Sequence, residues 1–288
     1  TNFQHPFAIT NKLVQLNGHL CRQLCSQTLG LIAAHTVVCR EHFTPELALR
    51  LITPECSLFY ARPGESSSFS ELPFSDPFWG FYWPGGQALA RHLLDNPGRV
   101  RGRRVIDVGC GCGAAGIAAL MAGAASVIFN DIDQVALEAT RLNLSINQLD
   151  HADGAIAATG QRVQFVSDDL IGQWPPLCTA NEQPQVMLIG DLFYSEEAAA
   201  RLADWALKAA AGGRPRGSAA AEVLVGDPGR YYFRLAAERA NLRLLARYCL
   251  PSEFMYEAGP GTGAVGVYAT MPKAADTNGA RPELGTID

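Results

Sequence analysis

The sequence predicts an α/β protein, in which a seven-stranded, mostly parallel sheet carries helices on both faces and ends in an antiparallel hairpin. Three observations lead to this prediction. Short apolar runs alternate with segments whose apolar residues recur every three or four positions, as in repeated strand–helix–strand units. The first of these strand-like runs leads directly into a glycine-rich turn. The last two runs have no helical pattern between them, so they form a hairpin at the sheet edge.

The predicted elements follow one another in a regular order. The predicted strands occupy residues 103–108, 126–129, 162–166, 185–189, 222–225, 242–248 and 264–270. The predicted helices occupy residues 84–94, 113–121, 135–146, 196–211 and 231–239. Pro84 stands at the first position of its helix, where a backbone N–H is not required, and Asn96-Pro97-Gly98 ends it. Because strand and helix alternate, the first strands run parallel, with helices on both faces.

Upstream of this pattern the sequence predicts a looser organisation. Thr44-Pro45-Glu46 has the order of an N-cap, a first-turn proline and a first-turn acid, and it predicts a short helix through Ile52. Residues 62–77 are rich in Ser, Pro and Gly and are expected to be a linker. The chain is therefore divided into an N-terminal helical extension with its linker, one α/β domain and a disordered tail, at residues 1–71, 72–271 and 272–288.

Composition excludes several classes of protein. The net charge is -5 over 288 residues, and no Lys/Arg-rich stretch exists to bind nucleic acid. The sequence contains no run of about 18 apolar residues, so it predicts no membrane-spanning helix. The eight cysteines have neither disulfide-framework nor zinc-site spacing, and we expect reduced, mostly buried thiols. The first 40 residues contain no acidic side chain, which is typical of an organelle transit peptide, although a frayed extension is the alternative.

The segment from Val105 to Gly113 carries the strongest functional signal. A buried strand runs into three glycines at every second position, Gly109, Gly111 and Gly113, and then into a helix. Such a turn lets the backbone approach a ligand closely and directs free N–H groups toward it. The glycine spacing, with Asp131 twenty residues past Gly111, also fits the dinucleotide fingerprint and leaves NAD as an alternative ligand.

Asp107 favours S-adenosylmethionine over NAD. It lies at the end of the strand, just before the turn. A pyrophosphate at this place would meet a carboxylate, and two like charges 4 Å apart repel by roughly 4 kcal/mol at an effective dielectric constant of about 20. S-adenosylmethionine carries an ammonium and a sulfonium, which the same carboxylate attracts.

Further polar and aromatic residues stand at the expected places. Asp131 follows the second strand, where its carboxylate can accept hydrogen bonds from both ribose hydroxyls. Asp168 follows the third strand, where it can accept a hydrogen bond from the adenine amino group. Trp83 precedes the first strand and can cover the cofactor. Each residue alone is equally well a turn Asp, an N-cap or a core Trp. Together they mark the carboxyl ends of successive strands, where open α/β sheets bind ligands.

Longer motifs link the chain to a known family. They are Leu49–Pro54, Ser75–Trp79, Tyr82–Leu89, Leu94–Pro97, Asp107–Ala114, Asn130–Asp133, Gly190–Tyr194 and Val225–Arg230. In these motifs the sequence resembles the seven-strand protein lysine methyltransferases, and most closely those that act on the β subunit of electron transfer flavoprotein. The resemblance implies a Rossmann-like fold, S-adenosylmethionine as cofactor, lysines of that subunit as acceptors, and the mitochondrial matrix as location, with the cytoplasm as the alternative.

The resemblance also implies the catalytic residues. Asp191-Leu-Phe-Tyr194 matches the family's Asp-x-x-Tyr/Phe motif after the fourth strand, so Asp191 orients the lysine and borders the cofactor, while Tyr194 lines the channel. The residue type agrees with this role. The attacking lysine must be neutral, yet only about one lysine in a thousand is neutral near pH 7, so a carboxylate is useful to orient the ammonium that arrives. Neither a metal ion nor a covalent nucleophile is needed. Alternatively, Asp191 caps the helix that follows, and Arg230 either positions an acidic partner or caps its own loop.

Other functions stay open at this point. The same cofactor turn serves methylation of another protein, for example a ribosomal protein, or of a small molecule. The segments 150–160 and 172–184 diverge from the family pattern and leave substrate choice open. A scaffold that binds the cofactor without turnover is disfavoured by the intact Asp107, Asp131 and Asp191. A dehydrogenase is disfavoured because we find no paired catalytic His and acid and no Tyr-x-x-x-Lys.

Overall fold

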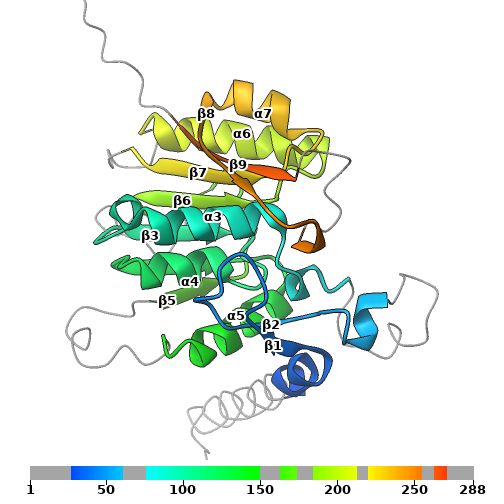
Figure 1. Cartoon of the computed structure of the whole chain (residues 1–288). Coiled ribbons are helices and arrows are strands. Elements are labelled where there is room, and N and C mark those ends of the chain that lie inside the picture. Colours follow the sequence, from blue (N-terminus) through cyan, green and yellow to red (C-terminus); the bar gives the residue numbers. More distant parts are fainter. Residues whose placement is uncertain are drawn as a thin grey trace, which may run out of the picture.

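The central feature of the computed structural model is a seven-stranded sheet with the strand order β5-β4-β3-β6-β7-β9-β8 (Figure 1). The structure describes residues 27–60, 76–149, 163–173, 184–212, 220–254 and 263–270. The strands of the sheet are β3 Arg104–Val108, β4 Ser126–Asn130, β5 Val163–Val166, β6 Val186–Gly190, β7 Glu222–Asp227, β8 Leu242–Cys249 and β9 Ala264–Thr270. β3 to β7 are parallel, and β9 is antiparallel to both β7 and β8. The predicted fold class is confirmed.

Helices cover both faces of the sheet (Figure 1). They are α3 Pro84–Asp95, α4 Ala114–Met121, α5 Gln134–Ile146, α6 Glu196–Ala210 and α7 Phe233–Arg239. Alternate residues of each central strand serve the two faces: Val105 and Leu188 belong to the core with α3 and α4, while Ile106 and Ile189 belong to the core with α6 and α7. Each fully buried aliphatic side chain of this kind stabilises the fold by about 1.5–3 kcal/mol.

Two glycines bring the start of α3 against the carboxyl end of β7. A Cβ atom on Gly85 would lie 2.2 Å from the carbonyl oxygen of Gly226, and one on Gly226 would lie 2.0 Å from the carbonyl oxygen of Gly85. No other residue permits this approach of two backbones. The first turn of α3 is therefore held at the edge of the sheet where the parallel strands end, on the right-hand side of Figure 1.

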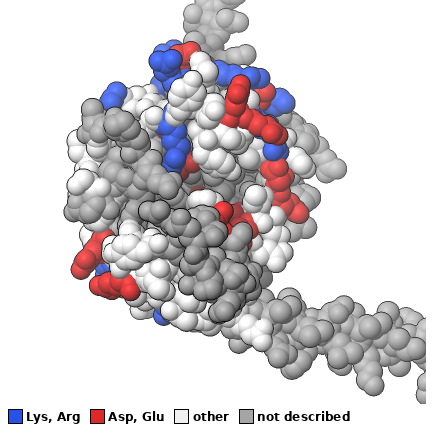
Figure 2. All heavy atoms as spheres, turned by 90° about the vertical axis from the view of Figure 1, so that its right-hand side faces the viewer, with Lys and Arg blue, Asp and Glu red and all other residues white. Residues whose placement is uncertain are grey.

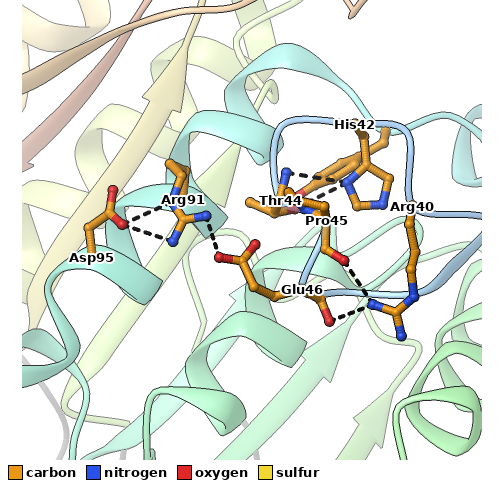
Figure 3. Close-up of polar contacts among 8 residues, drawn as sticks. Arg40, His42, Thr44, Pro45, Glu46, Arg91 and Asp95 are labelled. Carbon is orange, nitrogen blue, oxygen red and sulfur yellow. Dashed lines mark hydrogen bonds and ion pairs between the residues drawn. The ribbon is translucent and has the colours of Figure 1, made fainter.

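The helix predicted from Thr44 to Ile52 is wrong. This segment makes a turn and then the strand β2 Leu49–Leu51, which pairs in antiparallel fashion with β1 Val37–Cys39. The carbonyl oxygens of Pro45 and Glu46 accept hydrogen bonds from one Nη of Arg40 at 2.8 and 2.9 Å (Figure 3). These carbonyls are thus occupied by a side chain instead of by helical N–H groups.

Helix α5 supplies the second reason for the extended conformation. Asn143 accepts a hydrogen bond from the backbone N–H of Arg50 at 2.7 Å, and Asn147 bonds both the N–H and the C=O of Ala48. Thr44, the expected N-cap, instead contacts His42 and the hydroxyl of Tyr82 through Oγ1. Long-range side-chain contacts override the local helix signal here.

Several expectations fall wholly or partly outside the described residues. They are the linker up to residue 75, the divergent segment at 150–160, most of the divergent segment at 172–184, the tail after 270 and the first 26 residues. Of the described cysteines, Cys56, Cys110 and Cys112 are buried free thiols, Cys39 is half-buried and Cys249 is exposed. Within the described ranges, no helix is both long and apolar enough to cross a membrane.

Candidate active site

Acidic residues stand at the carboxyl ends of neighbouring parallel strands. From one side of the sheet to the other, Asp168 follows β5, Asp131 follows β4, Asp191 follows β6 and Asp227 ends β7. The glycine turn follows β3, in the middle of this row. The chain crosses from β3 to β4 on one side and returns to β6 on the other, so this is the topological switch point at which open sheets bind ligands.

The glycine turn has a backbone that other residues rarely adopt. Gly109, Gly111 and Gly113 have φ angles of 60°, 52° and 79°. A Cβ on Gly113 would lie 2.6 Å from the side chain of Thr140, whereas one on Gly111 would meet only the Cα of Trp79, at 3.9 Å. Gly113 is therefore needed for packing beneath the turn. Gly111 leaves open space above it, as a turn that receives a ligand requires.

Asp107 lies beneath the turn and is 3% exposed. Its Oδ2 accepts a hydrogen bond of 2.8 Å from the N–H of Gly116, in the first turn of α4. Burial raises the pKa of this carboxyl to about 7, and the nearby charge of Asp131 acts in the same direction. Only the ionised form attracts an ammonium, so this pKa couples cation binding to pH.

Asp131 joins the end of β4 to the glycine turn. Its Oδ2 accepts a hydrogen bond from the N–H of Gly111 at 2.9 Å, and its Oδ1 accepts one from Asp133 at 3.0 Å. Each carboxylate oxygen has a second lone pair that can accept a ribose hydroxyl. The neighbouring side chain of Ile132 is 73% exposed. Asp131, Asp107 and the glycine turn form what we call the glycine-turn cluster.

Asp168 is exposed, and it is positioned by a residue for which the sequence analysis proposed no role. The amide of Asn130, buried at the end of β4, donates to the carbonyl oxygens of Val166 at 2.9 Å and Asp168 at 2.8 Å. Asn130 thereby joins the β4 and β5 ends. Its sequence signal was a single polar residue closing an apolar run, which is also the usual pattern of a strand entering a loop.

Asp191 is held on both sides of its carboxylate. It is 7% exposed and has a φ of 58°. Its Oδ2 accepts a hydrogen bond from the N–H of Gly86 at 3.0 Å, and its Oδ1 forms an ion pair with Nη2 of Arg230 at 2.9 Å. Burial raises the pKa of Asp191, while the guanidinium of Arg230 opposes that rise.

The alternative role of Asp191 as the cap of the following helix is wrong. Ser195 caps α6, because its side chain accepts a hydrogen bond from the N–H of Ala198 at 3.3 Å. Asp191 instead caps the first turn of α3, which lies far away in the sequence. The guanidinium of Arg230 is paired with Asp191 within the chain, a contact that neither of its two expected roles included.

Trp83 stands directly before α3, beside Arg230. The guanidinium carbon of Arg230 lies 5.7 Å from the centroid of the Trp83 ring, within range of a cation–π interaction. The indole N–H donates to the carbonyl oxygen of Phe78 at 3.0 Å, and the ring packs beside Phe81. The structure thus brings Trp83 to the β6–β7 side of the site. Tyr194 is 64% exposed at the same edge.

Asp227 is a site residue that the sequence analysis named only as part of a motif. It is fully buried, and its Oδ1 accepts hydrogen bonds from the N–H groups of Gly229 and Arg230 at 2.7 and 2.8 Å. Burial raises its pKa to about 7. Its signal was a carboxylate ending a buried strand before Pro-Gly. We call Trp83, Asp191, Asp227 and Arg230 the arginine cluster.

The glycine-turn cluster fits S-adenosylmethionine. The space above Gly111 admits a ligand against backbone, the carboxylate of Asp107 matches its cationic methionine end, and Asp131 keeps acceptor capacity for its ribose. A pyrophosphate would instead face two carboxylates without a cation of the glycine-turn cluster between them. The described residues therefore favour S-adenosylmethionine over NAD, as Asp107 indicated.

Comparison with known proteins gives the same answer. Residues 89–171 match the family model "Ribosomal protein L11 methyltransferase (PrmA)". The chain is 42% identical over 226 residues to the electron transfer flavoprotein beta subunit lysine methyltransferase of Xenopus laevis, covering 77% of this chain and 78% of that protein. It is 38% identical over 237 residues to that of Danio rerio, covering 82% and 81%. The Caenorhabditis elegans homologue is 34% identical, covering 77% and 88%. The chain belongs to the electron transfer flavoprotein beta subunit lysine methyltransferase family.

Proposed function

We propose that this protein transfers methyl groups from S-adenosylmethionine to lysine side chains of the β subunit of electron transfer flavoprotein. The observation that carries the proposal is the 34–42% identity, over most of the chain, to proteins named for that activity. The motifs around Trp83 and Arg230, which are among those that carry the family resemblance, form one connected cluster at the ligand-binding edge.

The two clusters divide the work of the reaction. When bound, S-adenosylmethionine supplies a methyl group on a positively charged sulfur. The glycine turn, Asp107 and Asp131 hold the cofactor through backbone and carboxylate contacts. The arginine cluster, next along the sheet, presents Asp191 to the acceptor amine. Holding amine and methyl in line is the main requirement, because attack by a neutral amine needs no further activation.

The surface at this edge suits a folded protein partner. Figure 2 shows the side of the molecule that lies to the right in Figure 1, and both acidic and basic side chains are present on it. A surface for nucleic acid would carry a dominant basic field. The exposed ring of Tyr194 adds apolar area of the kind that protein interfaces use. These features support a protein substrate over a nucleic acid.

The proposal includes the mitochondrial matrix as the location, with the cytoplasm as the alternative. Residues 1–40 hold Lys12, Arg22 and Arg40 and no acidic side chain, which is the charge pattern of transit peptides. Microscopy of the tagged protein in cells tests this part by itself. A diffuse cytoplasmic signal would remove the matrix from the proposal and leave the chemistry untouched.

The substrate is tested by direct labelling. Purified enzyme, labelled S-adenosylmethionine and recombinant electron transfer flavoprotein are mixed, and the label is mapped by mass spectrometry. We expect label on lysines of the β subunit. A mitochondrial extract treated in the same way shows whether other proteins compete. Label on another protein or a small molecule, and none on the flavoprotein, would replace the proposed substrate.

A further inference from the structure

The carboxylate that the family motif assigns to the acceptor lysine already has a cation beside it. Arg230 places Nη2 at 2.9 Å and Nε at 3.2 Å from Oδ1 of Asp191. The side chain of Arg230 is 18% exposed and that of Asp191 is 6% exposed. The pair is thus largely shielded from water, where charge interactions are strong and solvent screening is weak.

Arg230 is held in this place from two directions. Asp227 accepts hydrogen bonds from the N–H groups of Gly229 and Arg230, which fixes the loop that follows β7. The ring of Trp83 lies beside the guanidinium, with 5.7 Å between the ring centroid and the guanidinium carbon. A side chain fixed by its own backbone turn and by an aromatic neighbour has a defined position, as a functional group requires.

The chemistry explains why a fixed positive charge is useful here. The amine of the acceptor attacks only when it is neutral. An isolated buried carboxylate beside it would stabilise the protonated amine instead. A neighbouring positive charge has the opposite effect, because it disfavours a second cation nearby. Arg230 therefore balances the charge of Asp191 and leaves its remaining lone pairs to orient an amine by hydrogen bonding.

The other groups that face Asp191 do not supply this balance. Helix α3 contributes the N–H of Gly86 and the weak positive end of its dipole. Strand β7 contributes the carboxyl of Asp227, whose charge acts against that of Asp191. The first turn of α6 carries only Glu196 and Glu197, both exposed. Among the described residues packed around Asp191, the positive side chain is that of Arg230.

We propose that Arg230 is a positioning residue of the methyl-transfer site, which fixes the Asp191 carboxylate and by its charge disfavours a protonated amine at the acceptor position. This inference rests on the proposed function in one respect, namely that Asp191 faces the acceptor lysine. It gives the Gly-Asp-Pro-Gly-Arg motif a role in the reaction beyond the turn that it forms.

The first test is the pH dependence of methyl transfer at saturating cofactor and substrate. The rate falls at low pH because the amine is protonated. Without the charge of Arg230 the amine holds its proton more tightly, so in Arg230→Gln the acidic limb of kcat should move to higher pH by about one unit or more. Arg230→Lys keeps the charge and should restore the limb toward that of the wild type. Arg234→Gln, which removes an exposed arginine from α7, is the matched control and should leave the limb in place.

The second test needs no substrate. Melting temperatures of Asp191→Asn, Arg230→Gln and the double variant form a cycle, and a coupled pair makes the double variant much more stable than the sum of the single losses predicts. Additive losses would show that Arg230 does not hold Asp191. An unmoved acidic limb in a folded Arg230→Gln would reduce Arg230 to a structural residue.

The two proposals fail separately. If wild-type enzyme places no label on the flavoprotein subunit, the proposed substrate is wrong. The acidic limb is then measured on the protein of the extract that does take label, and the stability cycle is unaffected. If the subunit is labelled but the limb stays in place, the substrate stands and the role of Arg230 is overturned.

Discussion

The glycine-turn cluster and the arginine cluster lie side by side at one edge of the sheet, yet they treat charge in opposite ways. Asp107 and Asp131 are buried or half-buried carboxylates that accept hydrogen bonds from backbone N–H groups. Asp191 has both a backbone N–H and a guanidinium as partners. The first cluster lacks a cation of its own, and the second contains one.

This difference matches the charge of what each cluster receives. The cofactor brings its own positive charges, and they complete the glycine-turn cluster, as a buried carboxylate requires. The acceptor amine must arrive neutral, and a site whose negative charge is already balanced does not select for an ammonium. The comparison therefore predicts that cofactor binding depends on carboxylate ionisation, whereas the arginine cluster governs the proton on the amine.

Asp227 provides the strongest test of this difference between the two clusters, because the largest expected effect is the one on stability at this residue. It belongs to the arginine cluster, yet burial raises its pKa to about 7. A carboxyl whose folded pKa lies above its unfolded value keeps its proton in the folded state while the unfolded chain ionises. The free energy of unfolding therefore falls as pH rises from about 4 to about 7, by about 1.4 kcal/mol for each unit of pKa shift.

Asp227→Asn removes this titration. We expect the melting temperature of the variant, relative to the wild type, to rise by several degrees between pH 4 and pH 8 in the absence of ligands. Calorimetry over this range is the measurement. Asp204→Asn, at an exposed carboxyl paired with Arg239, is the control. A constant difference at all pH values would mean that Arg230 neutralises Asp227 as well as Asp191.

Asp191→Asn separates binding from chemistry. The amide keeps the shape of the side chain but loses the charge that holds Arg230 and orients the amine. We expect kcat to fall by about 100-fold, as for a misplaced reacting group, while the dissociation constant of S-adenosylmethionine changes little. Rates and calorimetric affinities on the same preparation test this. Equal losses of both would place Asp191 in cofactor binding or in the fold alone.

Periodicity predicted the strands of the sheet and its helices to within two residues at each end. It did so because the spacing of apolar residues within a segment determines which face of the strand or helix is buried. The segment after Thr44 failed, since side chains of Arg40 and Asn143 take the backbone groups that a helix would use. A local N-cap pattern cannot register such partners. The glycine turn succeeded because its backbone demands are local too.

The site was predicted as a set of residues but not as two connected clusters. The partners of Asp191 lie 39 and 105 positions away in the chain, at Arg230 and Gly86. Nothing in the spacing of Asp191-Leu-Phe-Tyr194 indicates them. The strand order brings these positions to neighbouring strand ends, and only the folded sheet shows that the motifs containing Gly86 and Arg230 meet at Asp191.

Asp107 sharpens the comparison from the cofactor side. Its pKa of about 7 means that the carboxyl is largely neutral at pH 6 and largely ionised at pH 8. The affinity for S-adenosylmethionine should therefore rise over this range. Asp107→Asn should bind about 10- to 100-fold more weakly at pH 8, the loss of one charge-assisted hydrogen bond, and should show a flatter pH dependence. Calorimetry at both pH values decides, and an unchanged affinity at pH 8 would leave Asp107 as a support for α4 only.

Tyr194 carries the smallest expected effect and tests whether the arginine cluster faces the protein substrate. Its ring is 64% exposed, directly before the Ser195 cap of α6, so its removal costs the fold little. Tyrosine is enriched among the interface residues whose truncation costs more than about 1 kcal/mol of binding. Tyr194→Ala should thus raise the KM for the flavoprotein subunit several-fold and leave the affinity for S-adenosylmethionine unchanged. Ile132→Ala, at an exposed apolar side chain beside Asp131, is the matched control. It should weaken the binding of S-adenosylmethionine and leave the KM for the flavoprotein subunit unchanged. If both variants weaken cofactor binding and neither changes the KM for the substrate, the two clusters do not divide the two ligands as their charges indicate.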